Sequence, residues 1–307
     1  MNKKAILKKY WYQHTLFNSL LTIFRFGHSR KELDLMNEQN AYILKSKLQK
    51  KYGSVENYER KERLNDTKQL CEHQVIWSCW LQGMEKAPNL VKMCHSRLHQ
   101  LLDDQFDVIT LTNDNYKEYV NLPNYIIEKY ERGIISAAHF SDILRIEVLS
   151  VYGGIWVDAT VYLSDTQFIQ QHKQDQLFFY QVLPPARSAK VLWMSSWFII
   201  ANKNSSIINK TRSMLYKYWK SNDFLIDYFL FHYCFIIACE FNSDEYNSVV
   251  KYDNADPHLL QFELGTTYNE QRISNIFRQS DVHKLTYKNI NNENEETVLA
   301  HLLKNNL

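Results

Sequence analysis

The sequence lacks a long uninterrupted run of apolar residues. Its first 26 residues, MNKKAILKKYWYQHTLFNSLLTIFRF, mix apolar side chains with lysines and polar side chains and contain no small-residue cleavage site. A helix that crosses a bilayer needs about 20 consecutive, mostly apolar residues, and a secretory signal needs such a cleavage site. We therefore expect neither secretion nor a membrane-spanning helix.

Paired cysteine spacings are also missing. The chain has five cysteines, an odd number, and none of them forms the C-x-x-C pairs typical of zinc sites and redox centres. The five are Cys71, Cys79, Cys94, Cys234 and Cys239. This pattern favours a reduced compartment, and we expect the protein to be cytoplasmic.

A strong excess of charge of one sign is absent as well. The formal net charge at pH 7 is +2, whereas nucleic-acid-binding domains carry a strongly basic face or stripe. The sequence contains no internal repeat and no low-complexity segment. Because 45% of its 307 residues are hydrophobic, the chain is able to bury a sizeable core. We expect a globular protein that does not bind nucleic acid.

The first 70 residues carry helical patterns, and we predict that residues 1–70 form an N-terminal helical extension. Near the start, apolar residues recur at helical spacing among basic side chains. They are Ile6, Tyr10, Phe17, Leu20, Leu21 and Phe24. Two interpretations stay open: a peripheral contact with the inner face of the cell membrane, or packing of this stripe on the protein's own core or on a second copy. A second helix is expected over residues 32–51, ending at Gly53, with a linker over residues 54–70.

Strand and helix patterns alternate from residue 71 onward. Apolar runs predict strands, and amphipathic segments predict helices between and after them. The strands are expected over residues 74–80, 106–111, 176–182 and 197–201, and the helices over residues 88–102, 205–219 and 223–240. Such an alternation builds a parallel sheet with helices on its faces. We therefore predict an α/β domain over residues 71–290, followed by a tail helix over residues 291–307.

The segment SDILRIEVLSVYGGIWVDATVY, residues 141–162, joins three local signals. An amphipathic helix, on which Asp142 and Arg145 share one side, runs into a Gly-Gly stop. A short apolar strand follows and delivers Asp158 to its carboxyl end, the edge at which open α/β sheets bind ligands. Because a carboxylate at that edge can meet a metal ion or a ribose, we place the functional site here.

Several long motifs occur in the order typical of one bacterial family. They are IWSCWLQGMEKAPNLV, NYKEYVNLPNYIIEKYERG, HFSDILRIEVLSVYGGIWVDATVY, WFIIA, LIDYFLFHY, PHLLQ and VHKLTYK. Over residues 75–288 the chain resembles the capsular polysaccharide synthesis protein family of glycosyltransferases. The resemblance implies the GT-A fold, a nucleotide-binding α/β sheet joined to an acceptor-binding half. It also implies transfer of a hexose from a nucleoside diphosphate sugar, with a UDP-sugar as the expected donor, to a lipid-linked oligosaccharide acceptor.

The resemblance extends to the DxD motif that binds a divalent cation, Mn²⁺ or Mg²⁺, in GT-A enzymes. Here the triplet is Asp158, Ala159, Thr160, so a hydroxyl replaces the second acid. The resemblance implies a metal shell of Asp158, Thr160 and His283, in which the cation neutralises the departing diphosphate. With a single carboxylate, two arrangements stay open. Either the metal is held with help from elsewhere, or cations of the protein neutralise the diphosphate.

Other residues acquire roles by the same resemblance. Asp142 and Arg145 match a helix pair that lies against the nucleotide, although a local i,i+3 ion pair on a solvated helix also explains them. Lys284 and Lys288 match lysines that meet the diphosphate, although a surface strand with solvated lysines is the alternative. If this run is extended, His283 and Lys284 point to opposite sides, so the whole set cannot face one ligand.

Aromatic segments supply the last candidates. Trp77 is a candidate for stacking on a base or sugar, although tryptophans on strands also fill cores. In LIDYFLFHY, Asp227 is a candidate acceptor-site residue or base, whereas His232 points elsewhere on the expected helix and is interpreted as a core histidine.

Two further function classes compete with transfer. The hydroxyl at Thr160 suggests a sugar-nucleotide-binding or assembly protein that has the fold but no turnover. A metal-dependent hydrolase is disfavoured, because the sequence lacks the His-rich or paired-carboxylate spacing that activates water.

Overall fold

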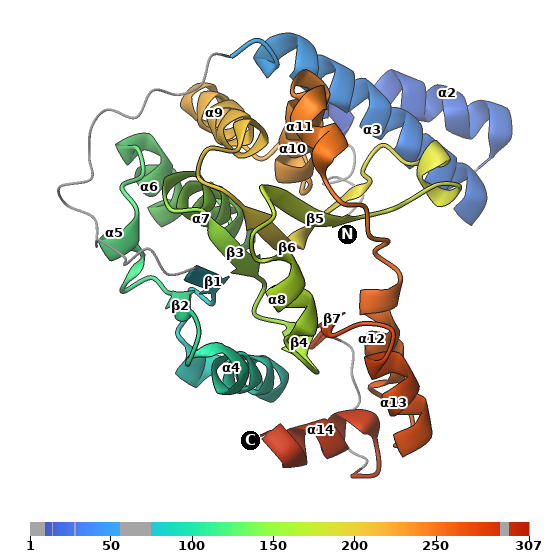
Figure 1. The fold of residues 1–307 in the computed structure, drawn as a ribbon. Coiled ribbons are helices and arrows are strands. Elements are labelled where there is room, and N and C mark those ends of the chain that lie inside the picture. Colours follow the sequence, from blue (N-terminus) through green and yellow to red (C-terminus); the bar gives the residue numbers. More distant parts are fainter. Residues whose placement is uncertain (1–9, 14, 28, 56–74, 289–294, 307) are drawn as a thin grey trace.

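A five-stranded sheet forms the centre of the structure, a computed structural model that describes residues 10–13, 15–27, 29–55, 75–288 and 295–306. The strand order is β2 (Asp107–Leu111), β1 (Val75–Cys79), β3 (Gly154–Val157), β6 (Met194–Ala201) and β5 (Leu177–Gln181) (Figure 1). The four strands predicted from apolar runs are confirmed, although β6 begins earlier than expected, at Met194. β3 is the apolar strand predicted ahead of Asp158.

The alternation of strands and helices predicted a parallel sheet, and this prediction is wrong in part, because the sheet is mixed. β1 runs parallel to β2 and to β3, but β6 lies antiparallel between β3 and β5. The physical reason is the return from β5 to β6, because an antiparallel pair needs no crossover helix, whereas a parallel pair does. That connection contains one short 3₁₀ turn, Ala186–Ala189. In the parallel part, β2-β1-β3, the carboxyl ends of neighbouring strands open at one edge.

Side chains of the central strands alternate between two cores on opposite faces of the sheet. Trp77 and Trp156 join the cluster that contains α7, α9 and α10, whereas Ile76 and Ile155 join the cluster that contains α4 and α8. These helices span Asn89–Leu102 (α4), Ala137–Val151 (α7), Gln167–His172 (α8), Ser206–Ser221 (α9) and Leu230–Phe241 (α10). Figure 1 shows α7 and α9 above the sheet and α4 below it.

Shorter helices complete the chain. They are α5 (Tyr116–Tyr119), α6 (Asn124–Glu131), α11 (Ser243–Ser248), α12 (Leu259–Glu263), α13 (Glu270–Phe277) and α14 (Val298–Asn306). Residues of α12, α13 and α14 form a third cluster with α4. The helices predicted over residues 88–102 and 205–219 are confirmed. The helix predicted from residue 223 begins only at Leu230, so the preceding stretch with Asp227 is not helical as expected.

Two helices make up most of the described N-terminal region, α2 (Leu16–Phe26) and α3 (Arg30–Tyr52). The predicted helix over residues 32–51 is confirmed by α3. Three of its side chains are buried in the same core cluster as α7 and α10, namely Leu44, Leu48 and Tyr52. Most of the predicted linker lies outside the described residues. The division into extension, domain and tail stays a prediction.

Helix α7 is fixed against α9 by a buried ion pair. Glu147, 3% exposed, accepts hydrogen bonds from the Arg212 guanidinium and from Tyr216 Oη, the latter at 2.6 Å. Removing one partner of such a pair leaves an uncompensated buried charge, which costs about 3–5 kcal/mol. The pair therefore holds α7 in one position relative to α9.

None of the helices within the described ranges combines the length and the apolar character needed to cross a bilayer. The cysteines in these ranges, Cys79, Cys94, Cys234 and Cys239, are free and buried. Burial raises the pKa of Cys79 to about 12, so that this thiol is protonated at neutral pH.

The Gly-Gly stop between α7 and β3 is required by both conformation and space. Gly153 and Gly154 have φ values of 74° and 99°, in the left-handed region that side chains disfavour. A Cβ atom on Gly154 would lie 2.4 Å from the Val75 carbonyl oxygen of β1. The two glycines therefore let α7 end directly against the strand that carries Asp158.

We predict that Gly154→Ala lowers the free energy of unfolding by about 3 kcal/mol or more, because backbone strain and the clash with β1 add up. Urea denaturation of the purified protein measures this value. The matched control is Gly265→Ala, where an added Cβ meets no atom within 4 Å. That variant should stay within about 0.5 kcal/mol of the wild type, and equal losses in both variants would refute the steric explanation.

Candidate functional site

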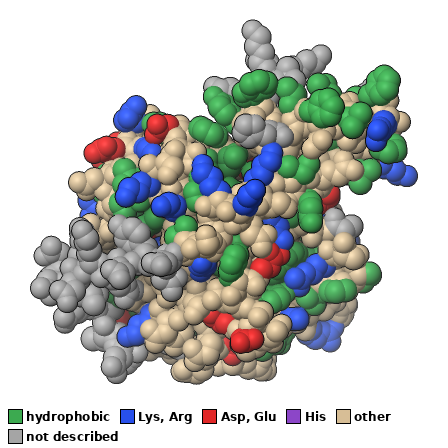
Figure 2. All heavy atoms as spheres, turned by 90° about the horizontal axis from the view of Figure 1, so that it is seen from above, with side chains coloured by type: hydrophobic (Ala, Val, Ile, Leu, Met, Phe, Trp, Pro, Cys, Tyr) green, Lys and Arg blue, Asp and Glu red, His purple; other side chains and the backbone are tan. Residues whose placement is uncertain are grey.

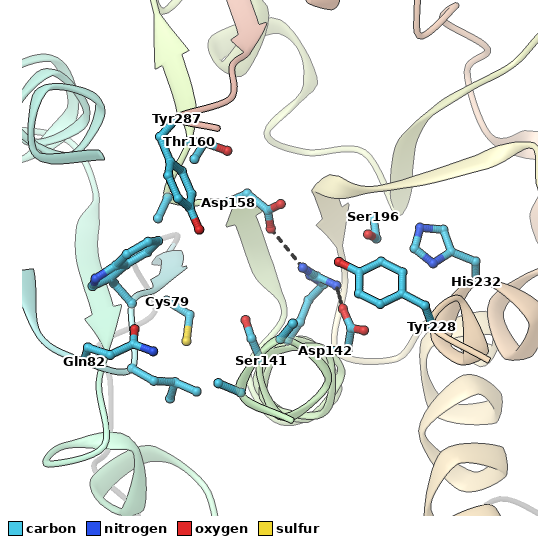
Figure 3. A pocket seen from close by; sticks show the side chains of 16 residues that line it. Cys79, Gln82, Ser141, Asp142, Asp158, Thr160, Ser196, Tyr228, His232 and Tyr287 are labelled. Atoms are coloured by element: carbon cyan, nitrogen blue, oxygen red, sulfur yellow. Dashed lines mark hydrogen bonds and ion pairs between the residues drawn. The ribbon is translucent and has the colours of Figure 1, made fainter. Parts of the chain in front are cut away.

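A pocket opens where the carboxyl ends of β1 and β3 meet the first half of α7 (Figure 3). Its volume is ≈ 420 Å³, within the range of about 300–1,000 Å³ that is typical of small-molecule sites. Cys79 and Gln82 lie on one side of it and Tyr228 and His232 on the other, with Asp158 between them. The functional edge predicted from the sequence is thus an open cavity, and Asp158 lines it.

The Asp158 carboxylate is held by three donors. Its Oδ1 accepts from Arg145 Nη2 at 2.9 Å and from Trp156 Nε1 at 2.8 Å, and its Oδ2 accepts from Lys284 Nζ at 2.8 Å. Burial alone would raise the pKa of Asp158, but the charges of Lys284 and Arg145 outweigh burial and hold the pKa at about 2. The side chain is therefore a fixed, fully ionised carboxylate at neutral pH.

Arg145 joins two acids within the site. Its guanidinium donates to Asp142 and to Asp158, and it stacks 4.7 Å from the ring centroid of Trp156 and 5.2 Å from that of Phe231. Burial acts to raise the pKa of Asp142, yet Arg145 lowers it below its ordinary value. The helix pair predicted from the sequence is therefore not a solvated ion pair, because Arg145 is 4% exposed and bridges α7 to the end of β3.

Lys284 reaches the site through a two-stranded antiparallel ribbon. β4 (Val161–Leu163) follows a turn after Asp158, and it pairs with β7 (Val282–Lys284), with Lys284 opposite Val161. Lys284 Nζ donates to Asp158 Oδ2 and to Thr160 Oγ1, each at 2.8 Å. The ammonium group thus lies between the two side chains that a DxD motif would use to hold one metal ion.

His283 points away from the pocket, which corrects its assignment as a metal ligand. Side chains alternate along β7, so His283 faces the side opposite to Lys284. It is fully buried, and its Nε2 lies 3.0 Å from Ser164 Oγ. Burial lowers the pKa of His283 to about 3, so the ring is neutral. It is a core histidine on the strand that delivers the lysine.

The residues present do not fit the predicted metal shell. Three donors already use the Asp158 oxygens, and an ionised carboxylate offers about four acceptor sites. Thr160 accepts from the same lysine, and His283 is turned away. Nowhere in the described part of the chain do three or more His, Cys, Asp or Glu residues gather in a group that could hold an ion.

Trp77 and Lys288 do not line the pocket either. Trp77 is 0% exposed and donates through Nε1 to the Gly153 carbonyl at 3.0 Å, so it fills the core beside the Gly-Gly stop. The tryptophan at the pocket is Trp80, just past β1, whose ring lies 5.8 Å from that of Tyr287. Lys288 is exposed at the end of the described segment, with its Nζ 6.0 Å from the Tyr287 ring.

Asp227 was expected at the site and His232 in the core, and the structure shows the reverse. Asp227 is 6% exposed, lies outside the pocket lining, and accepts from Gln13 Nε2 at 2.8 Å and from the Phe229 amide at 2.9 Å. His232 lines the pocket, and burial lowers its pKa to about 4. The error follows from the late start of α10, because the assumed helical phase between these two residues does not exist.

Comparison with models of known protein families shows the family of this chain. The model of the capsular polysaccharide synthesis protein family matches residues 53–302. The chain belongs to this family. The match extends beyond residues 75–288, over which the sequence motifs had indicated it. No curated protein matches the chain.

Among solved structures, the chain is similar to one described as "PaToxG Glycosyltransferase", at 15% sequence identity and a TM-score of 0.38. That similarity covers 80% of this chain and 100% of the other. A TM-score this low establishes neither a shared fold nor a shared activity.

The Asp158 network makes a prediction for acid stability. Because folding lowers the pKa of Asp158 from 3.8 to about 2, its ionised form stabilises the folded state above pH 4, and this contribution is lost as the pH falls through 2. The contribution at neutral pH is about 2 kcal/mol. Urea denaturation of wild type and Asp158→Asn across this range measures it. The stability gap should narrow towards low pH, and a gap independent of pH would contradict the assignment.

Proposed function

We propose that this protein is a glycosyltransferase of the GT-A type that transfers a hexose from a nucleoside diphosphate sugar, with a UDP-sugar as donor. Membership of the capsular polysaccharide synthesis family supports the class of reaction. The single observation that carries the proposal is the ionised Asp158 at the carboxyl ends of parallel strands, inside a pocket of ligand size. The proposed acceptor is a lipid-linked saccharide.

The two sides of the pocket suit the two substrates. On one side, Trp80 and Tyr287 offer aromatic faces and Gln82 offers an amide, which suit a base and its ribose. On the other side, Tyr228, 65% exposed, and His232 face the space across from them. We assign the nucleotide to the first side and the acceptor to the second, so that the transferred sugar lies over Asp158.

Cations of the protein take the role that the resemblance gave to a metal ion. The departing diphosphate develops negative charge, and fixed positive groups in a site that excludes water stabilise such charge strongly. Arg145 lines the pocket, and Lys284 compensates Asp158 from behind. The first turn of α7, with Ala137 and Ala138 at the pocket, adds backbone N–H groups and the positive end of the helix dipole.

His232 is the proposed base for the acceptor hydroxyl. Burial lowers the pKa of His232 to about 4, so the imidazole is neutral at physiological pH and is a weak base. Its Nδ1 is buried and makes no hydrogen bond with any described residue. With donor and acceptor held on either side of Asp158, positioning and charge stabilisation supply the larger part of catalysis.

We predict that Asp158→Asn lowers kcat for hexose transfer by about 100-fold or more, because an amide no longer fixes Arg145 and Lys284 in the positions that stabilise the departing diphosphate. Release of UDP from a panel of UDP-hexoses, with and without a saccharide acceptor, measures turnover. The matched control is Asp165→Asn, an exposed acid outside the pocket, which should keep wild-type turnover. A wild-type protein that binds these donors but releases no UDP would instead support the binding protein without turnover.

A second prediction concerns the metal. The wild type should retain transfer in the presence of a chelator, and Lys284→Ala should lose about 100-fold or more. The double variant Thr160→Asp/Lys284→Ala restores two acids at i and i+2 without the competing ammonium, so it should bind Mn²⁺ by calorimetry where the wild type does not. Loss of wild-type transfer in chelator, with recovery on adding Mn²⁺, would overturn the role of Lys284.

A further inference from the structure

Helix α2 buries polar side chains and exposes apolar ones, the reverse of an ordinary surface helix. Its buried side chains are polar, with Ser19 and Thr22 2% and 7% exposed. Large apolar side chains are exposed instead, with Phe17, Leu20 and Phe24 76%, 56% and 88% exposed. Because these three recur at i, i+3 and i+7, they form one stripe opposite the polar side chains. We call this stripe the outer face of α2.

Hydrogen bonds to α3 hold the helix in this orientation. Asn40 Nδ2 donates to Ser19 Oγ at 2.8 Å, and Thr22 Oγ1 donates to Gln39 Oε1 at 3.1 Å. The sequence left open whether the apolar stripe packs on the protein's own core, and for the outer face of α2 the structure contradicts that interpretation. Among the described residues of the chain, none covers the outer face of α2.

The positive charge near the outer face of α2 favours an anionic binding partner. The first 31 residues contain seven Lys and Arg residues and no Asp or Glu, namely Lys3, Lys4, Lys8, Lys9, Arg25, Arg30 and Lys31. The remainder of the chain has more acidic than basic residues. A symmetric dimer through this face would bring two such basic segments together, which is unfavourable, whereas an anionic lipid surface attracts them.

Two further aromatic side chains of this region are exposed. Trp11, which precedes α2, and Phe26, the last residue of α2, are 68% and 59% exposed. Figure 2 shows hydrophobic side chains gathered on the projecting corner of the molecule, beside Lys and Arg side chains. An exposed apolar stripe accompanied by exposed aromatic and basic residues is the pattern of helices that lie in a membrane interface. We propose that the outer face of α2 docks on a membrane surface rich in anionic phospholipid.

This surface is connected to the pocket. Gln13, 3% exposed, donates from Nε2 to Asp227 Oδ2 at 2.8 Å and to the Ile226 carbonyl at 3.1 Å. The next residue, Tyr228, lines the pocket on the side assigned to the acceptor. Asp227 is thus a positioning residue between the membrane-facing segment and the acceptor side. Only this link to a lipid-linked acceptor rests on the proposed function, whereas the docking itself does not.

Sedimentation of the full chain with vesicles tests the proposal. The probes are vesicles of phosphatidylglycerol mixed with phosphatidylcholine and vesicles of phosphatidylcholine alone, at low and high salt. The wild type should bind the anionic vesicles, with weaker binding at high salt. Leu20→Gln/Phe24→Gln should lower the partition coefficient roughly tenfold or more, because two exposed apolar side chains no longer enter the interface.

The matched control is Phe262→Gln, which replaces an equally exposed aromatic residue of α12, 71% exposed and outside α2. It should bind vesicles as the wild type does. Equal binding by the double variant, or equal binding of the wild type to neutral vesicles, would overturn the proposal. Absence of vesicle binding together with a wild-type dimer that the double variant abolishes would assign the face to a second copy. UDP release by the wild type and by both variants is measured in parallel without vesicles. Loss of vesicle binding is then distinguished from loss of the transfer reaction.

Discussion

The site depends on one buried guanidinium that bridges two carboxylates. Arg145 of α7 binds Asp142 on its own helix and Asp158 at the end of β3, so it ties the helix to the sheet at the edge where the pocket opens. Such a cation is stable in the interior only because both acids and two aromatic faces compensate for lost water. The position of α7, fixed from its other side by Glu147 and Arg212, therefore fixes the chemistry of the pocket.

Lys284 completes this arrangement from a distant part of the chain. The β4–β7 ribbon brings its ammonium group between Asp158 and Thr160, where the substitution of a hydroxyl for an acid leaves room for one cation of the protein. In a DxD motif a metal ion would compensate the two acids. Here only one acid is present, and the ammonium group of Lys284 compensates it. In this account the sheet edge supplies a neutralised carboxylate, and the positive end of α7 and Arg145 face the ligand.

Local sequence patterns predicted the strands, α3, α4, α9, the Gly-Gly stop and the place of Asp158, because burial and helix termination are properties of short segments. These patterns gave wrong predictions where the position of a side chain depends on contacts between residues far apart in the sequence. The choice of Lys284 over His283 depends on how β7 pairs with β4, and the place of Trp77 depends on its contacts with Tyr119, Tyr152 and the Gly153 carbonyl. The positions of Asp227 and His232 relative to the pocket were predicted wrongly, because a non-helical stretch precedes Leu230 and the assumed helical phase between the two residues does not exist. The reversed β6 and the inverted α2 likewise follow from tertiary contacts.

A crystal structure of the protein with a nucleoside diphosphate and Mn²⁺ in the same solution tests the central claim most directly. We expect the diphosphate to lie in the pocket beside Arg145 and the first turn of α7. We also expect the Lys284 ammonium still to bond Asp158 and Thr160, with no metal ion between them. A nucleotide bound elsewhere, or a Mn²⁺ ion that has displaced Lys284 from Asp158, would contradict the central claim.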